Sequence, residues 1–275
     1  MSGRQDSTDY GKLRSWIVGH QILSFFLLAY AISWPLWGLA ALGGGRAVVL
    51  LGGLGPLVSA LLITGLSGRS VCEWLRSLLV WRVSAVYYAI ALLFPAALYA
   101  VINLALFALG HELDFSLLLG IAPGYLGTFL LVATVGGGFE EPGWRGFALP
   151  LLQGRRSPVA STLLLGLAWG VWHIPLYGPA GFVVPLILAF FYTWLYNRTG
   201  SVLICVLLHA SFTPAQNMLI LEALPAGSGA EGLVDSVDLV ILGVYIVAAL
   251  FLTLATRGRL GFTPAERGRV GSTPV

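Results

Sequence analysis

Residues 136–146 read GGGFEEPGWRG and bring Glu140, Glu141 and Arg145 into one of the most apolar parts of the chain. The chain has 275 residues, of which 57% are hydrophobic and only 10% are charged, and its mean hydropathy is +0.87. This composition excludes an ordinary soluble domain and is typical of a membrane-embedded protein. Ionisable side chains are costly in or beside a hydrocarbon layer, so these three residues are candidates for function.

The hydrophobic pattern around this stretch predicts an all-α fold, a polytopic membrane helix bundle. A spanning helix needs roughly 20 mainly apolar residues, and about eight transmembrane helices of that length fit the sequence. The expected ranges are 17–42, 47–66, 84–109, 124–153, 158–177, 181–197, 201–222 and 237–256.

The basic residues outside the spans predict the topology. Eight spans place both termini on one side, and all of the 15 basic residues except Arg46 fall on that side. Basic loops remain in the cytoplasm, so we expect a multi-pass protein of the cell membrane with both termini cytoplasmic. The sequence pI of about 9.0 then reflects topology and contact with anionic lipid of the bilayer, and it does not indicate a nucleic-acid partner.

A single membrane domain is expected over residues 17–256, between a cytoplasmic N-terminal tail (1–16) and a cytoplasmic C-terminal tail (257–275). The first hydrophobic run is too long for the apolar region of a signal peptide, and we interpret it as an uncleaved span. Apolar and basic side chains interleave at helical spacing over residues 67–83, which indicates a helix at the cytoplasmic membrane surface or an ordinary connecting helix.

The depth of Glu140 determines whether it can act in a buried site. If the fourth span ended before it, the acidic pair would only flank a helix end. If the helix continues to about Gln153, Glu140 lies 16 residues before Arg156 in the next cytoplasmic turn, and His173 lies 17 residues after Arg156. At 1.5 Å per residue both would lie roughly 24–26 Å along adjacent antiparallel helices. His209 enters from another cytoplasmic turn, and helix tilt can bring it to a similar depth.

Pro142 and Gly143 are the strongest argument for the shallower position, because both residues weaken a straight helix. Proline frees the carbonyl four residues earlier, near Gly138, but bundles tolerate such breaks where neighbouring helices or water satisfy the backbone. We therefore expect the helix to continue through the motif with a local break. The three glycines at 136–138 are expected to let another helix approach closely.

The charged residues of the motif are expected to divide into two environments. Glu141 and Arg145 are four residues apart with the acid first, the favourable order for an ion pair on one helix face. Glu140 points about 100° away, so it can face a cavity and act as a general base beside a histidine. His173 and His209 both lie inside apolar helices, and together with the acidic pair they indicate one shared polar site.

These residues resemble the CPBP intramembrane proteases, a family that includes type II CAAX prenyl endopeptidases and bacteriocin-processing, self-immunity and lysostaphin-resistance-like proteins. The family pattern is a glutamate pair with a nearby arginine, then an aromatic residue four before a histidine, then a second histidine on a later helix. The matching residues are Glu140, Glu141, Arg145, Trp169, His173 and His209, within a motif region over 124–217. Residues 1–123 are similar to the family only in hydropathy.

The sequence departs from the family at two of these places. Trp169 stands where phenylalanine is usual, and Thr213 stands four residues after the last histidine, where the family usually has an asparagine that stabilises the oxyanion. A threonine hydroxyl can donate one hydrogen bond, so the role can survive in a weaker form. Removing an oxyanion donor can cost on the order of 10²–10³ in rate.

The resemblance implies an intramembrane endopeptidase that hydrolyses a peptide bond with an activated water in a membrane cavity. Glu140 would be the general base with His173 or His209, Glu141 and Arg145 would order the site, and His209 with Thr213 would polarise the scissile carbonyl. No cofactor is required. Two histidines and a glutamate (Glu140, His173 and His209) are also a known catalytic zinc set, but no HExxH signature is present and we favour metal-independent chemistry.

Other classes of protein fit the same residues. An inactive peptide-binding or immunity protein of the same fold is favoured by Thr213, and a proton-coupled transporter would also use buried glutamate and histidine, although it predicts inverted repeats that we do not find. Polar residues that serve only helix packing are a third alternative.

The expected partners of a protease are a peptide or protein substrate and the lipid bilayer. A prenylated CAAX tail, a leader peptide and a membrane-protein segment are all compatible substrates.

Overall fold

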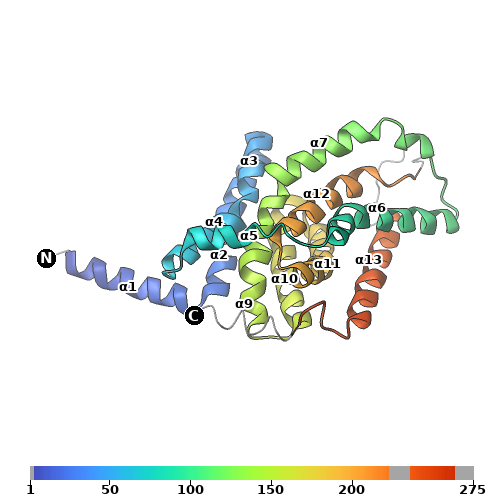
Figure 1. Cartoon of the computed structure of the whole chain (residues 1–275). Coiled ribbons are helices and arrows are strands. Elements are labelled where there is room, and N and C mark those ends of the chain that lie inside the picture. The colour runs from blue at the N-terminus through green and yellow to red at the C-terminus, as the bar shows by residue number, and fades with distance from the viewer. Residues whose placement is uncertain (1–2, 223–235, 264–275) are drawn as a thin grey trace.

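The computed structural model describes residues 3–222 and 236–263, and this part of the chain is built from helices without a β-sheet. The α-helices, drawn in Figure 1, are α1 (Gly3–Gly19), α2 (Gln21–Leu39), α3 (Gly45–Gly53), α4 (Gly55–Leu66), α5 (Val71–Leu78), α6 (Ala85–Ala108), α7 (Ile121–Thr134), α8 (Glu141–Gly143), α9 (Leu149–Gln153), α10 (Pro158–Tyr177), α11 (Val183–Thr199), α12 (Val202–Met218) and α13 (Ser236–Ala255). The expected all-α helix bundle is confirmed.

Five helical stretches are long and apolar enough to cross a membrane. They are Gln21–Leu66, Ala85–Ala108, Ile121–Gln153, Pro158–Tyr177 and Ser236–Ala255. The first stretch joins two expected spans, which are separated by a kink where Gly43 has φ +104° and Gly45 has φ +74°. α11 and α12 occupy two further expected ranges but have only 17 residues each. The count of eight spans stays a prediction.

The turns that the sequence predicted between the later helices are fixed by local capping. Ser157 accepts a hydrogen bond from the Ala160 amide at the start of α10, and Pro158 follows at a position where its missing N–H is not needed. Gly200 ends α11 in the left-handed conformation, with φ +63°, and Ser201 caps α12. These caps set the starting depth of α10 and α12, the helices that carry the two candidate histidines.

The fourth expected span is broken before the motif. α7 ends at Thr134, a 3₁₀ turn covers Gly137–Glu140, α8 follows, and a wide π-helical turn over Trp144–Ala148 leads into α9. Figure 1 shows that α7 and α9 run in different directions. The helical path therefore does continue to Gln153, as expected, but the break lies at the glycines and not at the proline. Pro142 stands in the first turn of α8, where no intrahelical N–H is required.

The core forms where α10, α11 and α12 meet the motif helix. The largest buried side chains are aromatic, and Trp144 packs against Phe25 of α2 and Trp172 of α10, with ring centroids 5.3 and 5.8 Å apart. Large apolar side chains on α6, α7 and α13 point outward instead, as expected for a surface that faces lipid. Examples are Leu104, Phe107, Leu126, Leu250, Phe251 and Leu254.

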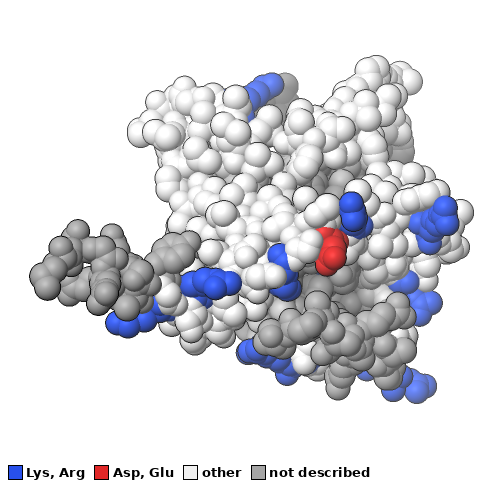
Figure 2. Space-filling view, turned by 60° about the vertical axis from the view of Figure 1, so that its left-hand side comes forward, with Lys and Arg blue, Asp and Glu red and all other residues white. Residues whose placement is uncertain are grey.

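The charged side chains that Figure 2 shows lie mostly in the lower half of the molecule, with one basic group at the top and an uncharged surface between them. This distribution agrees with the predicted sidedness, which itself stays a prediction. Arg145 is an exception to the expected basic flank, because its side chain is completely buried inside the bundle. Its place in the sequence suggested a span end, but the wide turn carries it into the core.

The segments expected as tails contain ordered structure where they are described. α1 is a helix over Gly3–Gly19, separated from α2 by a non-helical residue, His20. After α13, residues 256–261 form a tight turn in which Leu260 is fully buried and accepts a hydrogen bond from Asn197 of α11 at 2.9 Å. The first residues of the expected C-terminal tail are therefore part of the folded domain, and residues 264–275 lie outside the described part.

Candidate active site

Glu141, Arg145 and His209 form a buried charged cluster that joins the motif helix to α12. Arg145 Nη1 lies 3.1 Å from Glu141 Oε1 and 3.0 Å from Oε2, which confirms the expected ion pair. His209 Nδ1 lies 2.8 Å from Glu141 Oε1. Because a carboxylate only accepts hydrogen bonds, the proton of this contact is on Nδ1. Glu141 therefore fixes the orientation and the tautomer of the His209 ring, and Nε2 is left on the opposite side.

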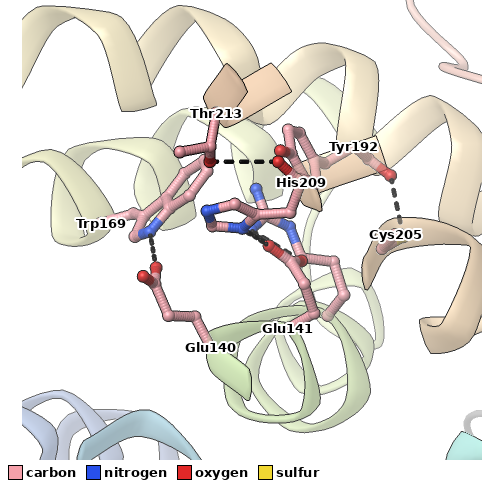
Figure 3. Close-up of polar contacts among 8 residues, drawn as sticks. Glu140, Glu141, Trp169, Tyr192, Cys205, His209 and Thr213 are labelled. Carbon is pink, nitrogen blue, oxygen red and sulfur yellow. Dashed lines mark hydrogen bonds and ion pairs between the residues drawn. The ribbon is translucent and has the colours of Figure 1, made fainter. Parts of the chain in front are cut away.

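Glu140 points away from this cluster, as its neighbouring position on the helix predicted. Its Oε2 accepts a hydrogen bond of 2.8 Å from Trp169 Nε1 on α10 (Figure 3). The side chain is buried, and Oε1 makes no hydrogen bond to any described residue. Phenylalanine, the usual residue of the family at this place, could not donate this bond. The tryptophan holds one carboxylate oxygen and leaves the other available.

The Arg145 guanidinium is enclosed between two aromatic rings. Its Cζ lies 4.1 Å from the ring centroid of Trp169 and 4.3 Å from that of Tyr192 on α11. These distances are typical of cation–π contacts. Burial removes water from the charge, and Arg145 Nε and Nη2 have no hydrogen-bond partner among the described residues. The contacts with the two rings partly offset this cost.

His173 lies one turn beyond Trp169 on α10 and is buried. Its Nδ1 donates to the Trp169 carbonyl at 2.9 Å, and its ring stacks on Tyr177 with centroids 5.6 Å apart. The structure thus brings α10 to the depth of Glu140, but the direct partner of Glu140 on this helix is Trp169. His173 packs beside that contact, with ring centroids of Trp169 and His173 separated by 5.6 Å.

Glu140 Oε1 and His209 Nε2, the two atoms that make no hydrogen bond described above, both lie close to Gly137. A Cβ placed on Gly137 would lie 2.6 Å from His209 Nε2 and 3.2 Å from Glu140 Oε1. Both atoms therefore border the same small space beside the glycine. A side chain at this position would collide with the histidine, whereas glycine lets both atoms approach the backbone closely. The neighbouring Gly138 has the packing role expected from the sequence, because its Cβ would meet Val206 of α12 at 2.8 Å.

Thr213 lies one turn after His209 on α12, but its hydroxyl is engaged. Thr213 Oγ1 donates to the His209 carbonyl at 3.2 Å within the same helix (Figure 3). Asn217, a further turn along, donates to the Thr213 carbonyl at 2.7 Å and is exposed. Asn217 is therefore used by its own helix, and the hydroxyl of Thr213 must leave its backbone bond before it can donate to a substrate.

Two residues of this site were not predicted from the sequence. The role of Tyr192 could not be predicted, because it is one of many aromatic residues in an apolar helix. Its contact with Arg145 depends on the packing of α11 against the motif helix. Gly137 was assigned to helix packing along with its neighbours. A signal for its role existed in the triple glycine directly before the acidic pair, but the sequence cannot distinguish which glycine faces the histidine.

The described residues contain no group of three or more histidine, cysteine, aspartate and glutamate side chains that is arranged to hold a metal ion. Glu140, His173 and His209, the set expected for zinc, are therefore not grouped as ligands. We derive no step through a metal.

Comparison with known proteins gives a match in the region of this site. Residues 121–213 match the model of a family described as type II CAAX prenyl endopeptidase Rce1-like. Through this segment the chain is similar to the type II CAAX prenyl endopeptidases that the family model describes. All of the residues predicted for the site lie within the matched segment: Glu140, Glu141, Arg145, His173, His209 and Thr213. With its apolar helices, the chain is thus a multi-pass membrane protein.

One curated relative is similar to this chain over a short segment. The chain is 49% identical over 47 residues to a protein named CAAX prenyl protease 2 from Methanococcus maripaludis. The match covers 17% of this chain and 16% of the relative. The similarity is thus strong but local.

Proposed function

We propose that this protein is an intramembrane endopeptidase that hydrolyses a peptide bond with a water molecule held between Glu140 and His209. The observation that carries the proposal is the convergence of Glu140 Oε1 and His209 Nε2 beside Gly137. The other polar atom of each side chain is already hydrogen-bonded: Glu140 Oε2 accepts from Trp169, and His209 Nδ1 donates to Glu141. Two such atoms, held in place and left without partners, are suited to bind and activate a water.

In this reaction Glu140 is the general base. Its carboxylate takes one proton from the water while the water oxygen bonds to the carbonyl carbon, and the carbonyl oxygen becomes an oxyanion. The carbon–nitrogen bond then breaks, and the leaving nitrogen takes the proton back from Glu140. The second proton of the water leaves with the acid product and passes to the amine. No covalent bond to the enzyme forms, so no nucleophilic side chain is needed.

His209 and its support stabilise the oxyanion in this proposal. When protonated, His209 carries an Nε2–H that points to the shared space, and Glu141 balances its positive charge from the other side. Arg145 in turn holds the Glu141 carboxylate in place through their ion pair. Thr213 can add a second donor if its hydroxyl rotates away from the His209 carbonyl. His173 supports the site by packing against Trp169.

We propose that the reaction does not use a metal. The support for this is geometric, since the described residues bring no three histidine, cysteine, aspartate or glutamate side chains together to hold a metal ion. A water polarised by a carboxylate and a histidine requires no Lewis acid. Assay of metal in the active protein tests this part separately.

The substrate is proposed to be a peptide or protein that reaches the site from the cytoplasm or the membrane, in a cell-membrane protein with both termini cytoplasmic. The basic residues at one end of the molecule support this orientation. The name of the curated relative makes a prenylated CAAX peptide the first substrate to test. A leader peptide and a membrane-protein segment are the alternatives.

A second function is favoured by one observation. The Thr213 hydroxyl is bonded to the backbone, so the site has one oxyanion donor fewer in this arrangement. A protein with this site could bind a peptide without cleaving it. Measuring binding and cleavage on the same sample distinguishes the two functions.

The test is cleavage of a peptide panel by purified protein, with wild type, Glu140→Gln and the control Glu73→Gln compared. Glu73 is an exposed carboxylate on α5 that makes none of the contacts described for the site. The panel contains a prenylated CAAX peptide, the same peptide without the prenyl group and a leader peptide. General acid–base catalysis contributes typically about 10²–10⁴ in rate, so we expect a loss of that size for Glu140→Gln and none for the control. Equal cleavage by wild type and Glu140→Gln would exclude Glu140 as the base. Binding without cleavage by the wild type would favour the second function.

A further inference from the structure

A separate groove lies at the end of three helices, outside the candidate active site. It has a volume of about 540 Å³ and forms between the start of α6, the end of α11 and the segment that follows α13. Its lining combines basic, hydroxyl and aromatic groups, with Tyr87, Trp194, Arg198, Thr256, Arg259 and Phe262 among them. None of the lining residues is acidic.

The two arginines give the groove a positive charge that the described protein does not neutralise. Arg198 and Arg259 form no ion pair with any described carboxylate. Arg198 Nε donates to the Tyr87 hydroxyl at 3.2 Å, which orients the guanidinium along α6. Its aliphatic part is held against Gly261, where a Cβ would lie 2.7 Å from Arg198 Cγ. The charge of Arg198 is therefore positioned, and its remaining donors are available to a ligand.

The turn that carries Arg259 is fixed in an unusual conformation. Arg257 and Leu260, two non-glycine residues on either side of it, have φ of 51° and 45°, in the left-handed region that favours glycine. Buried contacts hold this turn: the Leu260 amide donates to Thr256 Oγ1 at 3.1 Å, and the Leu260 carbonyl accepts from Asn197. Such a conformation persists only where the surroundings determine it, and it is enriched at functional sites. Its effect here is to hold the backbone of Arg259 at the groove, whose lining also includes Arg198.

The depth of the groove indicates the kind of ligand. α6 and α13 are membrane-spanning stretches, and the groove lies where one begins and the other ends. This is the level at which the phosphate groups of a bilayer leaflet lie. An aromatic pair, Tyr87 and Trp194, with ring centroids 6.4 Å apart, borders the groove, as expected at a membrane interface. Val86 and Ile90 continue the lining with apolar side chains along α6.

We propose that this groove binds an anionic phospholipid of the surrounding leaflet. Arg198 and Arg259 bind its phosphate, the hydroxyl groups of Tyr87 and Thr256 lie beside the headgroup, and an acyl chain follows Val86 and Ile90. Bidentate contacts between guanidinium groups and phosphate oxygens are strong and directional. The combination of two arginines with an apolar wall selects a lipid over a free phosphate ion, because only the lipid uses both.

The proposal is tested on the full-length protein purified in an uncharged detergent. Binding of phosphatidylglycerol, phosphatidylcholine and inorganic phosphate is titrated by native mass spectrometry and by the shift in melting temperature. The variant is Arg198→Gln/Arg259→Gln, and the matched control is Arg155→Gln/Arg156→Gln, which removes two exposed arginines from another turn. Arg259→Gln alone serves as a second variant, since this side chain is exposed and does not carry the packing of Arg198. The melting temperature without lipid shows whether each variant is folded.

We expect phosphatidylglycerol to bind more tightly than phosphatidylcholine to the wild type and to the control. A basic residue near an anionic lipid contributes about 1 kcal/mol, so each arginine removed should weaken binding about fivefold and the pair about 25-fold. Unchanged binding by the folded Arg259→Gln variant, or an equal loss in the control, would overturn the proposal. Inorganic phosphate that binds as tightly as phosphatidylglycerol would also overturn it, because the site would then hold an ion and not a lipid.

Discussion

Two buried polar clusters of this molecule differ in how many of their polar atoms have hydrogen-bond partners. In the cluster between α6 and α13, the hydroxyls of Tyr99 and Tyr245 are 2.8 Å apart. Asn103 uses its whole amide, donating to the carbonyls of Tyr99 and Leu219 and accepting from the Leu221 amide, at 2.7 to 2.9 Å. Every polar group of that asparagine side chain has a partner, and the cluster is uncharged. Its effect is to join helices.

The cluster around Glu141 is built differently. Its ion pair and histidine bond are short and buried, but Arg145 Nε and Nη2 have no hydrogen-bond partner among the described residues. Buried polar groups are normally satisfied, and each exception in a native structure needs a reason. The comparison teaches that a closed neutral cluster serves architecture, whereas a charged cluster with open atoms is prepared for chemistry.

Among the variants that test this comparison, Arg145→Ala should cause the largest loss of free energy of unfolding. It leaves Glu141 buried without its cation, and breaking a buried ion pair typically costs about 3–5 kcal/mol in the free energy of unfolding. Unfolding in mixed micelles with increasing denaturing detergent measures the loss. The double variant Glu141→Gln/Arg145→Met should recover much of it, because no unpaired charge remains. A cost for Arg145→Ala within error of zero would contradict the assignment of a buried ion pair.

Gly137→Ala tests the open space directly. The new methyl group would lie 2.6 Å from His209 Nε2, closer than van der Waals contact allows, and 3.2 Å from Glu140 Oε1, so it should move the histidine and disturb the proposed water. A displacement of about 1 Å in an active site can cost about 10² in rate, and we expect such a loss in peptide cleavage. Gly127→Ala on α7 is the control, since a Cβ there meets nothing within 4 Å. Full activity of Gly137→Ala would show that the space beside the glycine is not used.

Asn103→Leu tests the neutral cluster. It removes the partners of the Leu219 carbonyl and the Leu221 amide, and an unsatisfied buried polar group costs about 1–3 kcal/mol. We expect lower stability in the same unfolding assay and unchanged cleavage per folded molecule. Asn217→Leu, an exposed position on α12, should change stability much less. If Asn103→Leu abolished cleavage in fully folded protein, the division between architecture and chemistry would be wrong.

Trp169→Phe should give the smallest change. Phenylalanine keeps a ring beside Arg145 but cannot donate to Glu140, so the carboxylate loses one fixed oxygen. A hydrogen bond to a charged group is worth about 1.5–3 kcal/mol, and we expect at least a tenfold fall in kcat/KM for the cleaved peptide. Trp34→Phe, which removes a comparable indole bond to the Trp172 carbonyl, is the control and should leave kcat/KM unchanged. Equal values for Trp169→Phe and wild type would show that this bond does not position the base.

Much of the architecture follows from the sequence, because apolar length and basic turns are local properties of the chain. Each of the expected ranges contains a helix, and the i, i+4 spacing correctly predicted the pair Glu141–Arg145. The partner of His209 was not predictable, since Glu140 and Glu141 differ only by a rotation about the helix axis. The break before the motif was also misplaced. Proline at the start of a helical turn does not disrupt it, and the three glycines before it do.

The wide turn that contains Arg145 is supported by a residue far away in the sequence. Pro150 has no N–H, so it cannot donate to the Gly146 carbonyl four residues before it, and the indole of Trp74 on α5 donates to this carbonyl at 3.1 Å. Leu78 of the same helix packs on Gly146 so closely that a Cβ there would lie 2.5 Å from it. The segment that matches the family model, 121–213, therefore depends on contacts with α5, which lies outside it. Transplanted into another bundle without α5, it would lose the indole that donates to the Gly146 carbonyl, one residue from its buried arginine.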